Sequence, residues 1–327
     1  MKNLGLLIAF VLCGITSLSA QQVWHVKQNG TGDGKAWDSA TGDLQATLDK
    51  AQAGDQIWVA EGIYLPTTTQ DRSISFNIKD GIQLFGGFAG TEVTLEERDW
   101  KEHITVLSGD IGEEKATEDN SHTVVIFKNV SSSTALDGFV VAEGEAIEGW
   151  GDPDDPTSCG AAIFNIADGE LSSPIIKNCR FVNNYAFYGA AIYNYSLNQG
   201  HCKPVITDSQ FENNIAELNG GVIYNSAVEG FAYPVVRNSI FIENIATFGA
   251  VVYTKYSDCK YAPSFEGCEF RENIAFNRGQ VEYDKMASNA DGFCRTMKVN
   301  CMEVNNVASI QTKQTVQSNA RKRTAYR

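Results

Sequence analysis

Basic residues are scarce in this chain: 26 Lys and Arg stand against 40 Asp and Glu, a formal net charge of −14. Such a surface repels phosphate backbones, which argues against nucleic acid as a partner. Only four histidines are present, and they are scattered without the spacing of metal ligands. No segment after residue 20 approaches the roughly 18 consecutive apolar residues of a transmembrane helix. Helical periodicity over about ten residues is also missing, which argues against a helical-repeat protein.

The first 20 residues have the composition of a secretory signal. Lys2 supplies the positive charge, residues 4–15 form the apolar segment, and residues 17–20 (Ser-Leu-Ser-Ala) offer small side chains for cleavage. We therefore expect residues 1–20 to be a signal peptide, which implies export from the cytoplasm.

What the chain does contain is a repeat of about 30 residues. Four times a proline is followed seven residues later by Phe and ten residues later by Asn, with starts 30, 30 and 29 residues apart. The columns are Pro174, Pro204, Pro234 and Pro263; Phe181, Phe211, Phe241 and Phe270; and Asn184, Asn214, Asn244 and Asn273. Self-similarity at a fixed period indicates stacked units that share one continuous core.

Each repeat contains three short strand-like pieces separated by turn residues, for example 204–208, 209–214 and 220–225. This pattern predicts an all-β fold, a right-handed parallel β-helix in which every coil pairs with the next. Identical residues then stack in register. The Phe column fills the core, and the Asn column exchanges amide hydrogen bonds along the stack.

Upstream of the regular coils at residues 160–284 the repeat is degenerate, and we expect earlier coils between residues 56 and 141. Residues 43–53 predict a short amphipathic helix, with Asp43 as its N-cap and Gly54 as its stop. A solenoid exposes its core at both ends, so this helix is expected to close the N-terminal end.

At the C-terminal end the repeat decays, because Glu282 occupies a column that earlier holds Ile192. A carboxylate buried in that column would be costly. We therefore predict that the stack ends near residue 284, with the β-helix over residues 21–285 and a partly disordered tail over 286–327. After Glu303 this tail has no acids and five basic residues: Lys313, Arg321, Lys322, Arg323 and Arg327.

Cysteines are not expected to define the fold. Cys179 and Cys268 share a column but lie three coils apart, about 14 Å at about 4.8 Å per strand, which is beyond the ~7 Å limit for a disulfide. Cys294 and Cys301 are the local pair that we expect.

The N-terminal half carries five further motifs in order: Trp37-Asp-Ser-Ala, Ala53-Gly-Asp-Gln-Ile-Trp-Val-Ala60, Phe85-Gly-Gly-Phe-Ala-Gly-Thr-Glu92, Glu97-Arg-Asp-Trp100 and Leu107-Ser-Gly-Asp-Ile111. With them, residues 23–285 resemble the secreted pectin-lyase-like β-helix proteins of Bacteroidetes. The repeat is also similar to that of the chlamydial polymorphic outer-membrane proteins. The resemblance implies a protein that is secreted, or held at the outer membrane or cell surface of a Gram-negative bacterium.

One column of the repeat is aromatic: Phe164, Tyr193, Tyr224, Tyr253 and Tyr283. If the preceding residues Ile192 and Ile223 point inward, strand alternation turns these rings outward, about 4.8 Å apart. An open strip of rings suits stacking on sugars, and we predict it as the glycan-binding site. The alternative is a ladder of rings packed on each other and covered by loops.

The segment between Val141 and Cys159 is rich in carboxylates. Asp152, Asp154 and Asp155 are candidates for binding Ca²⁺, which prefers oxygen ligands. Their spacing is not that of an EF-hand, and a solvated acidic loop is the alternative. No other cofactor is expected.

Candidate catalytic groups are hard to find in the repeats. Arg237 and Glu266 have the spacing of a surface ion pair, and no paired carboxylates occupy matched columns for glycoside hydrolysis. The sequence therefore predicts a non-catalytic exported protein that binds glycans or host or cell-surface ligands along an elongated face. A polysaccharide lyase or hydrolase acting on acidic polysaccharide is the first alternative, and a purely structural surface protein is the second.

Overall fold

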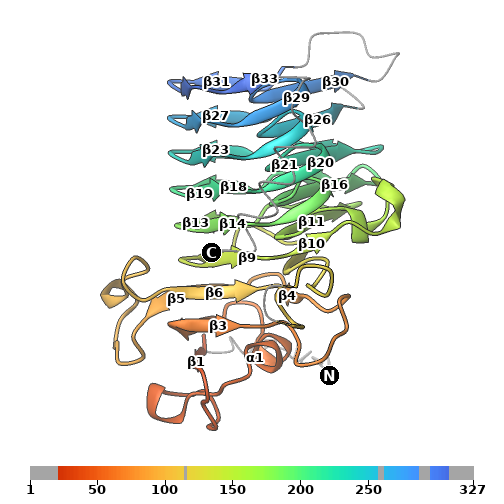
Figure 1. Ribbon diagram of the computed structural model, residues 1–327. Helices are drawn as coiled ribbons and strands as arrows, with labels where there is room; N and C mark the ends of the chain where they lie inside the picture. The colour runs from red at the N-terminus through yellow and green to blue at the C-terminus, as the bar shows by residue number, and fades with distance from the viewer. Residues whose placement is uncertain (1–20, 114–115, 257–260, 287–294, 309–327) are drawn as a thin grey trace, which may run out of the picture.

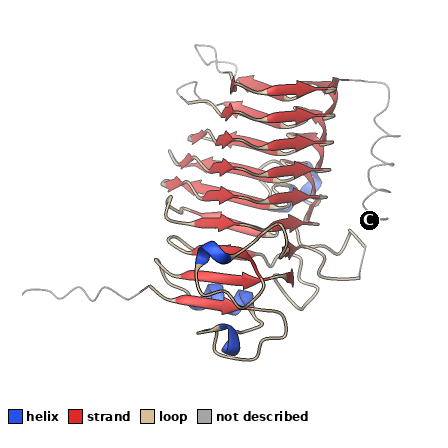
Figure 2. Ribbon diagram, turned by 90° about the vertical axis from the view of Figure 1, so that its left-hand side faces the viewer, coloured by secondary structure: helices blue, strands red, loops and turns tan. Residues whose placement is uncertain are grey.

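The molecule is a stack of coils whose parallel strands line up in sheets that run along its length (Figure 1). The computed structural model describes residues 21–113, 116–256, 261–286 and 295–308. The predicted signal peptide lies outside these residues. The longest sheet has nine strands, one for each coil, so the predicted all-β parallel β-helix is confirmed (Figure 2).

Four long sheets and one short sheet make up the solenoid. Sheet A contains β1 (Val23–Val26), β2 (Gln56–Ala60), β5 (Gln83–Phe88), β8 (Ala135–Asp137), β13 (Ile175–Lys177), β18 (Val205–Thr207), β23 (Val235–Arg237), β27 (Ser264–Glu266) and β31 (Met297–Val299). Sheet B contains β3 (Gly62–Tyr64), β6 (Thr105–Ser108), β9 (Val140–Ala142), β14 (Arg180–Val182), β19 (Gln210–Glu212), β24 (Ile240–Ile242), β28 (Glu269–Arg271) and β32 (Met302–Val304).

Sheet C contains β4 (Phe76–Ile78), β7 (Val125–Lys128), β11 (Ile163–Asp168), β16 (Ile192–Leu197), β21 (Ile223–Ala227), β26 (Val252–Tyr256) and β30 (Glu282–Met286). Sheet D contains β10 (Glu145–Ala146), β15 (Tyr185–Tyr188), β20 (Ile215–Asn219), β25 (Ile245–Phe248), β29 (Ile274–Arg278) and β33 (Val307–Ala308). Sheet E contains β12 (Leu171–Ser172), β17 (His201–Cys202) and β22 (Phe231–Ala232).

Each regular coil therefore has at least one strand more than the three predicted pieces, and the coils with β12, β17 and β22 also have a short strand in sheet E. The additional strand that all regular coils share is the one in sheet D, such as β20, which begins directly after the turn that holds Asn214. Its signal in the sequence is the Ile-Ala pair that recurs at 215–216, 245–246 and 274–275. The early coils predicted between residues 56 and 141 are present as β2 to β9.

The Phe column is stacked inside the core, as predicted. The rings of Phe181 and Phe211 lie 4.7 Å apart with planes 7° apart, and those of Phe211 and Phe241 lie 4.8 Å apart with planes 3° apart. All are fully buried. Burial of such a ring contributes about 1.5–3 kcal/mol to folding, which makes this column a main source of stability.

The Asn column forms the predicted ladder at the turn between sheets B and D. Nδ2 of Asn184 donates to Oδ1 of Asn214 at 3.0 Å, and Asn214 and Asn244 repeat this contact toward the next coil at 3.0 and 2.9 Å. Nδ2 of Asn214 also donates to the carbonyl oxygen of Phe181 at 2.9 Å. These amides have no exposed surface, so the ladder satisfies polar groups that would otherwise be costly to bury.

The N-terminal helix α1 (Leu44–Lys50) closes the first coil. Oδ1 of Asp43 accepts a hydrogen bond from the N–H of Ala46 at 2.8 Å, which confirms the predicted N-cap. Leu44 and Leu48 are buried in the main core. The helix ends earlier than predicted, with Ala51 as C-cap, and Gly54 lies in the turn that follows. Short 3₁₀ helices η1 (Trp37–Ser39), η2 (Leu95–Glu97), η3 (Gly149–Gly151) and η4 (Pro156–Ser158) lie in loops.

The N-terminal motifs have structural roles. The carboxylate of Glu92 accepts hydrogen bonds from the backbone N–H groups of residues 89–91 at 2.6–2.9 Å. Partial burial opposes ionisation, but these bonds outweigh it and hold the pKa of Glu92 below its usual value. Arg98 pairs with Asp137 at 2.9 Å, and its guanidinium lies over the ring of Trp100. The turn is therefore held together by charge and hydrogen bonds.

The predicted end of the stack near residue 284 is one coil too early. Strands β31, β32 and β33 add a further coil up to Ala308. Glu282, Lys298 and Glu303 take the core columns of Val252, Phe265 and Phe270. Nζ of Lys298 lies 2.6 Å from Glu282 and 2.5 Å from Glu303.

Charged side chains thus close the C-terminal end of the core. Partial burial works against the charge of Lys298, but its hydrogen bonds to Glu282 and Glu303 outweigh that effect and raise its pKa. The carboxylate that looked too costly to bury is therefore paired, which is why the stack continues past it.

The described cysteines, Cys159, Cys179, Cys202, Cys268 and Cys301, are free thiols. Burial raises the pKa of Cys179 to about 12, so this thiol is a packing group rather than a nucleophile. Cys294, the predicted partner of Cys301, lies outside the described residues. Within the part of the chain that the structure describes, no helix is long and apolar enough to cross a membrane.

Candidate functional site

The predicted aromatic column is present, but it is not an open strip. Tyr193 stacks on Phe164 at 5.3 Å and on Tyr224 at 5.0 Å, and the stack continues through Tyr253 to Tyr283. Phe164, Tyr193, Tyr224 and Tyr253 are between 0% and 6% exposed, and only Tyr283 is half-buried. The ring faces that were expected to contact sugars contact each other instead.

A loop of the chain covers the edges of this column. The hydroxyl of Tyr193 donates to the carbonyl oxygen of Pro153 at 2.6 Å, and that of Tyr188 donates to the carbonyl oxygen of Gly151 at 2.8 Å. Burial raises the pKa of Tyr193 well above its usual value. The covered ladder, which was the alternative to an open strip, is therefore what the structure contains.

The three aspartates predicted to bind Ca²⁺ belong to this covering loop. Oδ1 of Asp155 accepts from the N–H and hydroxyl of Thr157, and Oδ1 of Asp154 accepts from the hydroxyl of Tyr195 at 2.9 Å. Oδ1 of Asp152 accepts from the N–H of Asp154. Among the described residues no cluster of three ligating side chains is formed, and Ca²⁺ binding stays a prediction.

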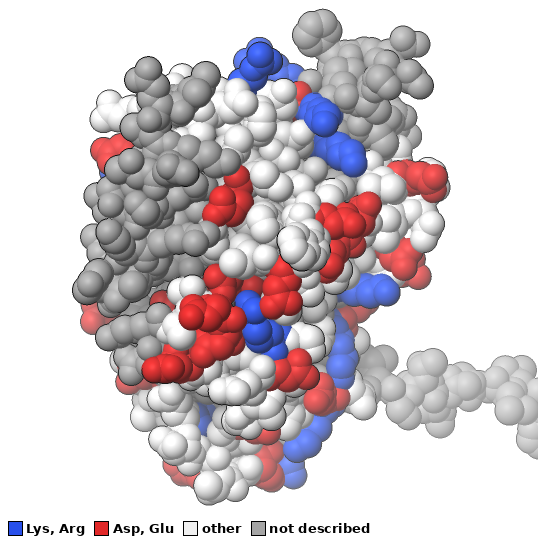
Figure 3. All heavy atoms as spheres, turned by 45° about the vertical axis from the view of Figure 1, so that its right-hand side comes forward, with Lys and Arg blue, Asp and Glu red and all other residues white. Residues whose placement is uncertain are grey.

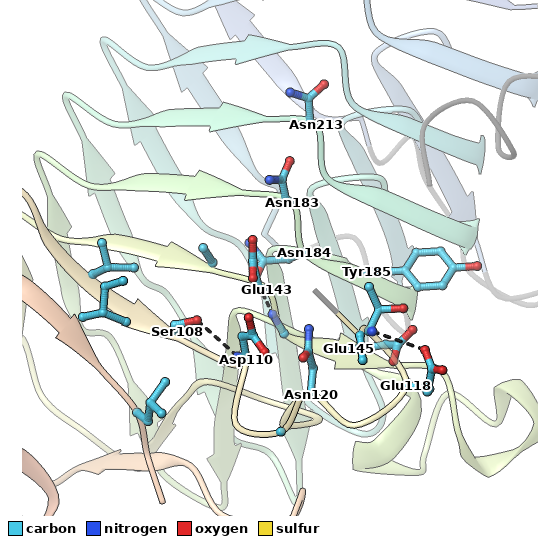
Figure 4. A pocket seen from close by; sticks show the side chains of 18 of the residues that line it. Ser108, Asp110, Glu118, Asn120, Glu143, Glu145, Asn183, Asn184, Tyr185 and Asn213 are labelled. Carbon is cyan, nitrogen blue, oxygen red and sulfur yellow. Dashed lines mark hydrogen bonds between the residues drawn. The ribbon is translucent and has the colours of Figure 1, made fainter. Parts of the chain in front are cut away.

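A groove that sequence analysis did not predict lies beside sheets B and D. It has a volume of about 670 Å³ and is formed where residues 108–113 and 116–120 meet the turns of later coils (Figure 4). Its lining combines apolar and polar side chains: Ile63, Leu65, Val106, Ser108, Asp110, Thr117, Glu118, Asn120, Glu143, Glu145, Asn183, Asn184, Tyr185, Asn213 and Ile215.

Turn geometry aligns the polar side chains of this groove. Glu143, Asn183 and Asn213 occupy the same turn position in successive coils, with φ of 61°, 57° and 55°. Figure 4 shows them one above another, with Asp110 close to Glu143. Asn tolerates this left-handed conformation, whereas Glu adopts it only at a cost. The column therefore places amide and carboxylate oxygens along one side of the groove.

The groove is acidic. Asp110, Glu118, Glu143 and Glu145 contribute carboxylates, and none of the described lining residues is Lys or Arg. Burial, with a further contribution from the nearby charge of Asp110, raises the pKa of Glu143 above its usual value. On the face in Figure 3, acidic side chains gather over the lower half, where the N-terminal coils lie.

Arg72 connects two segments that line the groove. Its guanidinium pairs with Glu145 and Glu148, and its Nε donates to the carbonyl oxygen of Asn120 at 2.6 Å. Residues 116–120 and strand β10 are thereby joined through one side chain. Glu145 is thus a structural group, while Asp110, Glu118 and Glu143 remain as the carboxylates of the groove.

Sequence reasoning missed this groove because its residues come from distant parts of the chain. Asp110, Glu143 and Asn213 share no local motif and meet only when three coils and an irregular loop are stacked. Glu at the turn position of residue 143 was no signal either, because Glu243 and Glu272 occupy the same position outside the groove lining.

Comparison with known proteins gave one family match and several similar solved structures. Residues 208–226 match the Chlamydia polymorphic membrane protein repeat. Among solved structures the chain is similar to the pectate lyase Pel9A, at 12% identity and a TM-score of 0.31, with 85% of this chain and 80% of that chain covered. It is also similar to the pectin methylesterase from Aspergillus niger, at 12% identity and a TM-score of 0.33, with 89% of each chain covered.

These findings define a parallel β-helix protein that carries a repeat of the chlamydial membrane-protein type. Similarity at 12% identity carries no information on activity. No curated protein sequence matches the chain.

Proposed function

We propose that this chain is an exported, non-catalytic β-helix protein of the bacterial surface that binds glycans in the groove beside sheets B and D. The observation that carries the proposal is the groove itself, a concave surface of about 670 Å³ with converging amide and carboxylate oxygens. The signal-like composition of residues 1–20 and the membrane-protein repeat at residues 208–226 support export and a surface location.

The lining suits a neutral or amino sugar. Carboxylate and amide groups such as Glu118 and Asn213 accept and donate hydrogen bonds to hydroxyls, and the half-buried ring of Tyr185 offers an apolar contact. An acidic groove without basic side chains among its described residues repels uronic acids. This argues against the acidic polysaccharide that sequence analysis named for the enzymatic alternative.

Affinity electrophoresis tests the proposal. The full chain should be retarded in gels that contain a neutral or amino-sugar polysaccharide and not in gels that contain a polyuronate. Tyr185→Ala should abolish the retardation, while the matched variant Tyr233→Ala, a half-buried tyrosine beside sheet E and outside the groove lining, should keep it. Equal retardation of both variants, or retardation by polyuronate alone, would contradict the proposed site.

Glycoside hydrolysis is the second candidate function, and one observation favours it. Glu143 is a carboxyl with a raised pKa beside the carboxylate of Asp110, an arrangement that can separate an acid from a base. If this pair is catalytic, the protein releases reducing sugar from a bound polysaccharide, and Glu143→Gln stops the release without abolishing binding. A purely structural surface protein shows neither release nor retardation.

A further inference from the structure

Trp150 lies at the tip of the loop at residues 147–158, which projects from the side of the stack (Figure 1). Its exposed fraction is 103%, so the residue is as open to solvent as in an isolated peptide. The other four tryptophans of the chain are buried or half-buried. A Trp ring removes about 150–250 Å² of surface from water when it packs. Folding gains none of this from Trp150, so the ring has no role in stability.

The backbone around Trp150 holds the ring in this exposed position. Gly149, Trp150 and Gly151 all have a left-handed conformation, with φ of 63°, 55° and 71°. Glycine adopts it freely, whereas for a large side chain it has a cost. The hydroxyl of Tyr188 donates to the carbonyl oxygen of Gly151 at 2.8 Å, and that of Ser158 donates to the carbonyl oxygen two residues before the ring. The ring is therefore positioned before any partner arrives, which lowers the entropic cost of binding.

The surface next to Trp150 is apolar. A Cβ at Gly151 would lie 3.4 Å from Cδ1 of Leu218 and 3.6 Å from Cδ1 of Phe187, so the loop packs against both side chains. Both are half-buried and belong to sheet D, in β20 and β15. Trp150 thus extends an apolar surface of the stack. Trp is enriched among the residues that contribute most to protein–protein binding.

Carboxylates surround the ring. The loop has no Lys, Arg or His, and its acidic residues are Glu148, Asp152, Asp154 and Asp155. The three aspartates accept hydrogen bonds from neutral N–H and O–H groups, which leaves their charges uncompensated. Among the described residues, the ion pairs of this loop all involve Glu148, with Arg72 and His122 as partners. The exposed ring is therefore set in a negative surface.

We propose that Trp150 anchors a docking surface for a partner protein that presents a basic segment, with an Arg or Lys side chain on the face of the indole. Trp binds a cation over its ring more strongly than the other aromatic side chains do. Asp152 and Asp154 are exposed beside it and add to the attraction.

The charge of the loop decides between the possible partners. A neutral sugar could stack on the ring but would gain nothing from the charge of the carboxylates, and an anionic lipid surface would be repelled. None of the loop residues lines the groove beside sheets B and D. The docking surface is therefore a second site, and it does not depend on the glycan site of the proposed function.

Fluorescence anisotropy of labelled octa-arginine with the full chain tests the role of the ring. Trp150→Ala should weaken binding by about fivefold or more, and Trp150→Phe should lie between the variant and the wild type. A net charge of −14 attracts any polycation, so a loss on changing an uncharged side chain separates the ring from general attraction. The thermal midpoint of Trp150→Ala should equal that of the wild type, which shows that the variant is folded. Unchanged affinity in this variant would overturn the proposal.

A second pair of variants tests the charges. Asp152→Asn/Asp154→Asn removes two charges but keeps the oxygens that accept hydrogen bonds within the loop. It should weaken binding several-fold. The matched control Asp38→Asn/Glu96→Gln removes two exposed carboxylates elsewhere and should bind as the wild type does. Equal weakening in both variants would mean that the peptide responds to net charge alone and would contradict the docking surface.

Quenching of tryptophan fluorescence by acrylamide reports on the ring directly. Trp150 should be the tryptophan that acrylamide reaches most readily, and octa-arginine should protect it, whereas an octa-glutamate peptide should not. Absence of protection would show that the peptide binds elsewhere. Protection by a neutral oligosaccharide in place of the basic peptide would make this surface a glycan site, which also rejects the proposal.

Discussion

The ring of Tyr224 lies 5.0 Å from that of Tyr193 in the preceding coil, and the two planes are 2° apart. Tyr224 stacks in the same way on Tyr253, at 5.0 Å and 4°. Both faces of Tyr224 are thus covered by neighbouring rings, and the column packs as a second core outside the first.

Removal of one ring from this column should therefore act on stability. We expect Tyr224→Ala to lower the free energy of unfolding by about 3–5 kcal/mol, because the ring is buried and its loss leaves a cavity between two others. Chemical denaturation measures the effect, with Tyr195→Ala, a half-buried ring on the same strand as Tyr193, as the milder control. Unchanged stability together with lost glycan binding would restore the open-strip hypothesis.

Glu272 has a left-handed backbone conformation that Asn adopts at lower cost. Its φ is 54° and its side chain is exposed, while the same position holds Asn183 and Asn213 in earlier coils. We expect Glu272→Asn to stabilise the protein by about 1 kcal/mol, since Asn enters the left-handed region at lower cost. A shift of the thermal midpoint upward checks this, and a downward shift would show that the Glu side chain has a stabilising contact.

The charged end of the core depends on Lys298. We expect Lys298→Ala to destabilise the last coil by about 1–2 kcal/mol, because Glu282 and Glu303 then face the core end without a partner. Adding Glu282→Gln and Glu303→Gln to this variant should recover most of the loss. Hydrogen exchange of β31 to β33 reports the effect locally, and absence of any change there would mean that the pairing contributes nothing.

The stability of the protein should depend on pH through Glu143. Its pKa is higher in the folded state than in the unfolded chain, where it has its ordinary value of about 4.5. The folded state therefore holds the proton more tightly, and the contribution of Glu143 to stability falls as the pH rises from the ordinary to the raised pKa.

Glu143→Gln cannot ionise and so isolates this contribution. The difference in unfolding free energy between the variant and the wild type should grow in favour of the variant through that pH window and stay constant above it. Denaturant titrations at a series of pH values measure the difference. A gap that is constant across the series, or that closes as the pH rises, would contradict the raised pKa.

Much of the fold was accessible from sequence because a solenoid repeats its packing. The Phe181 and Asn184 columns each predict a ladder, and both ladders are present. The last coil was missed because Glu282, in the column of Ile192, was read as the end of the stack. Glu303 also replaces Phe in that coil, although Cys301 and Asn306 keep the spacing of Cys268 and Asn273. Pairing between Lys298 and Glu282 depends on three-dimensional proximity, which no column pattern reveals.

The candidate site was less accessible for the same reason. Alternation correctly turned Tyr193 away from the core, but whether an outward ring meets solvent depends on where the loop at Pro153 folds. The groove depends on an irregular loop that brings Asp110 close to Glu143. Such a loop has no repeating pattern from which its path could be predicted.

The most direct test of the central claim, that the groove rather than the aromatic column binds glycan, is a glycan array. The array is probed with the chain itself and with two variants, each of which carries one substitution. We predict selective binding of neutral or amino-sugar glycans that is lost on adding Tyr185→Ala in the groove and kept on adding Tyr233→Ala. Absence of any selective binding, or binding that survives Tyr185→Ala in a folded protein, would contradict the claim.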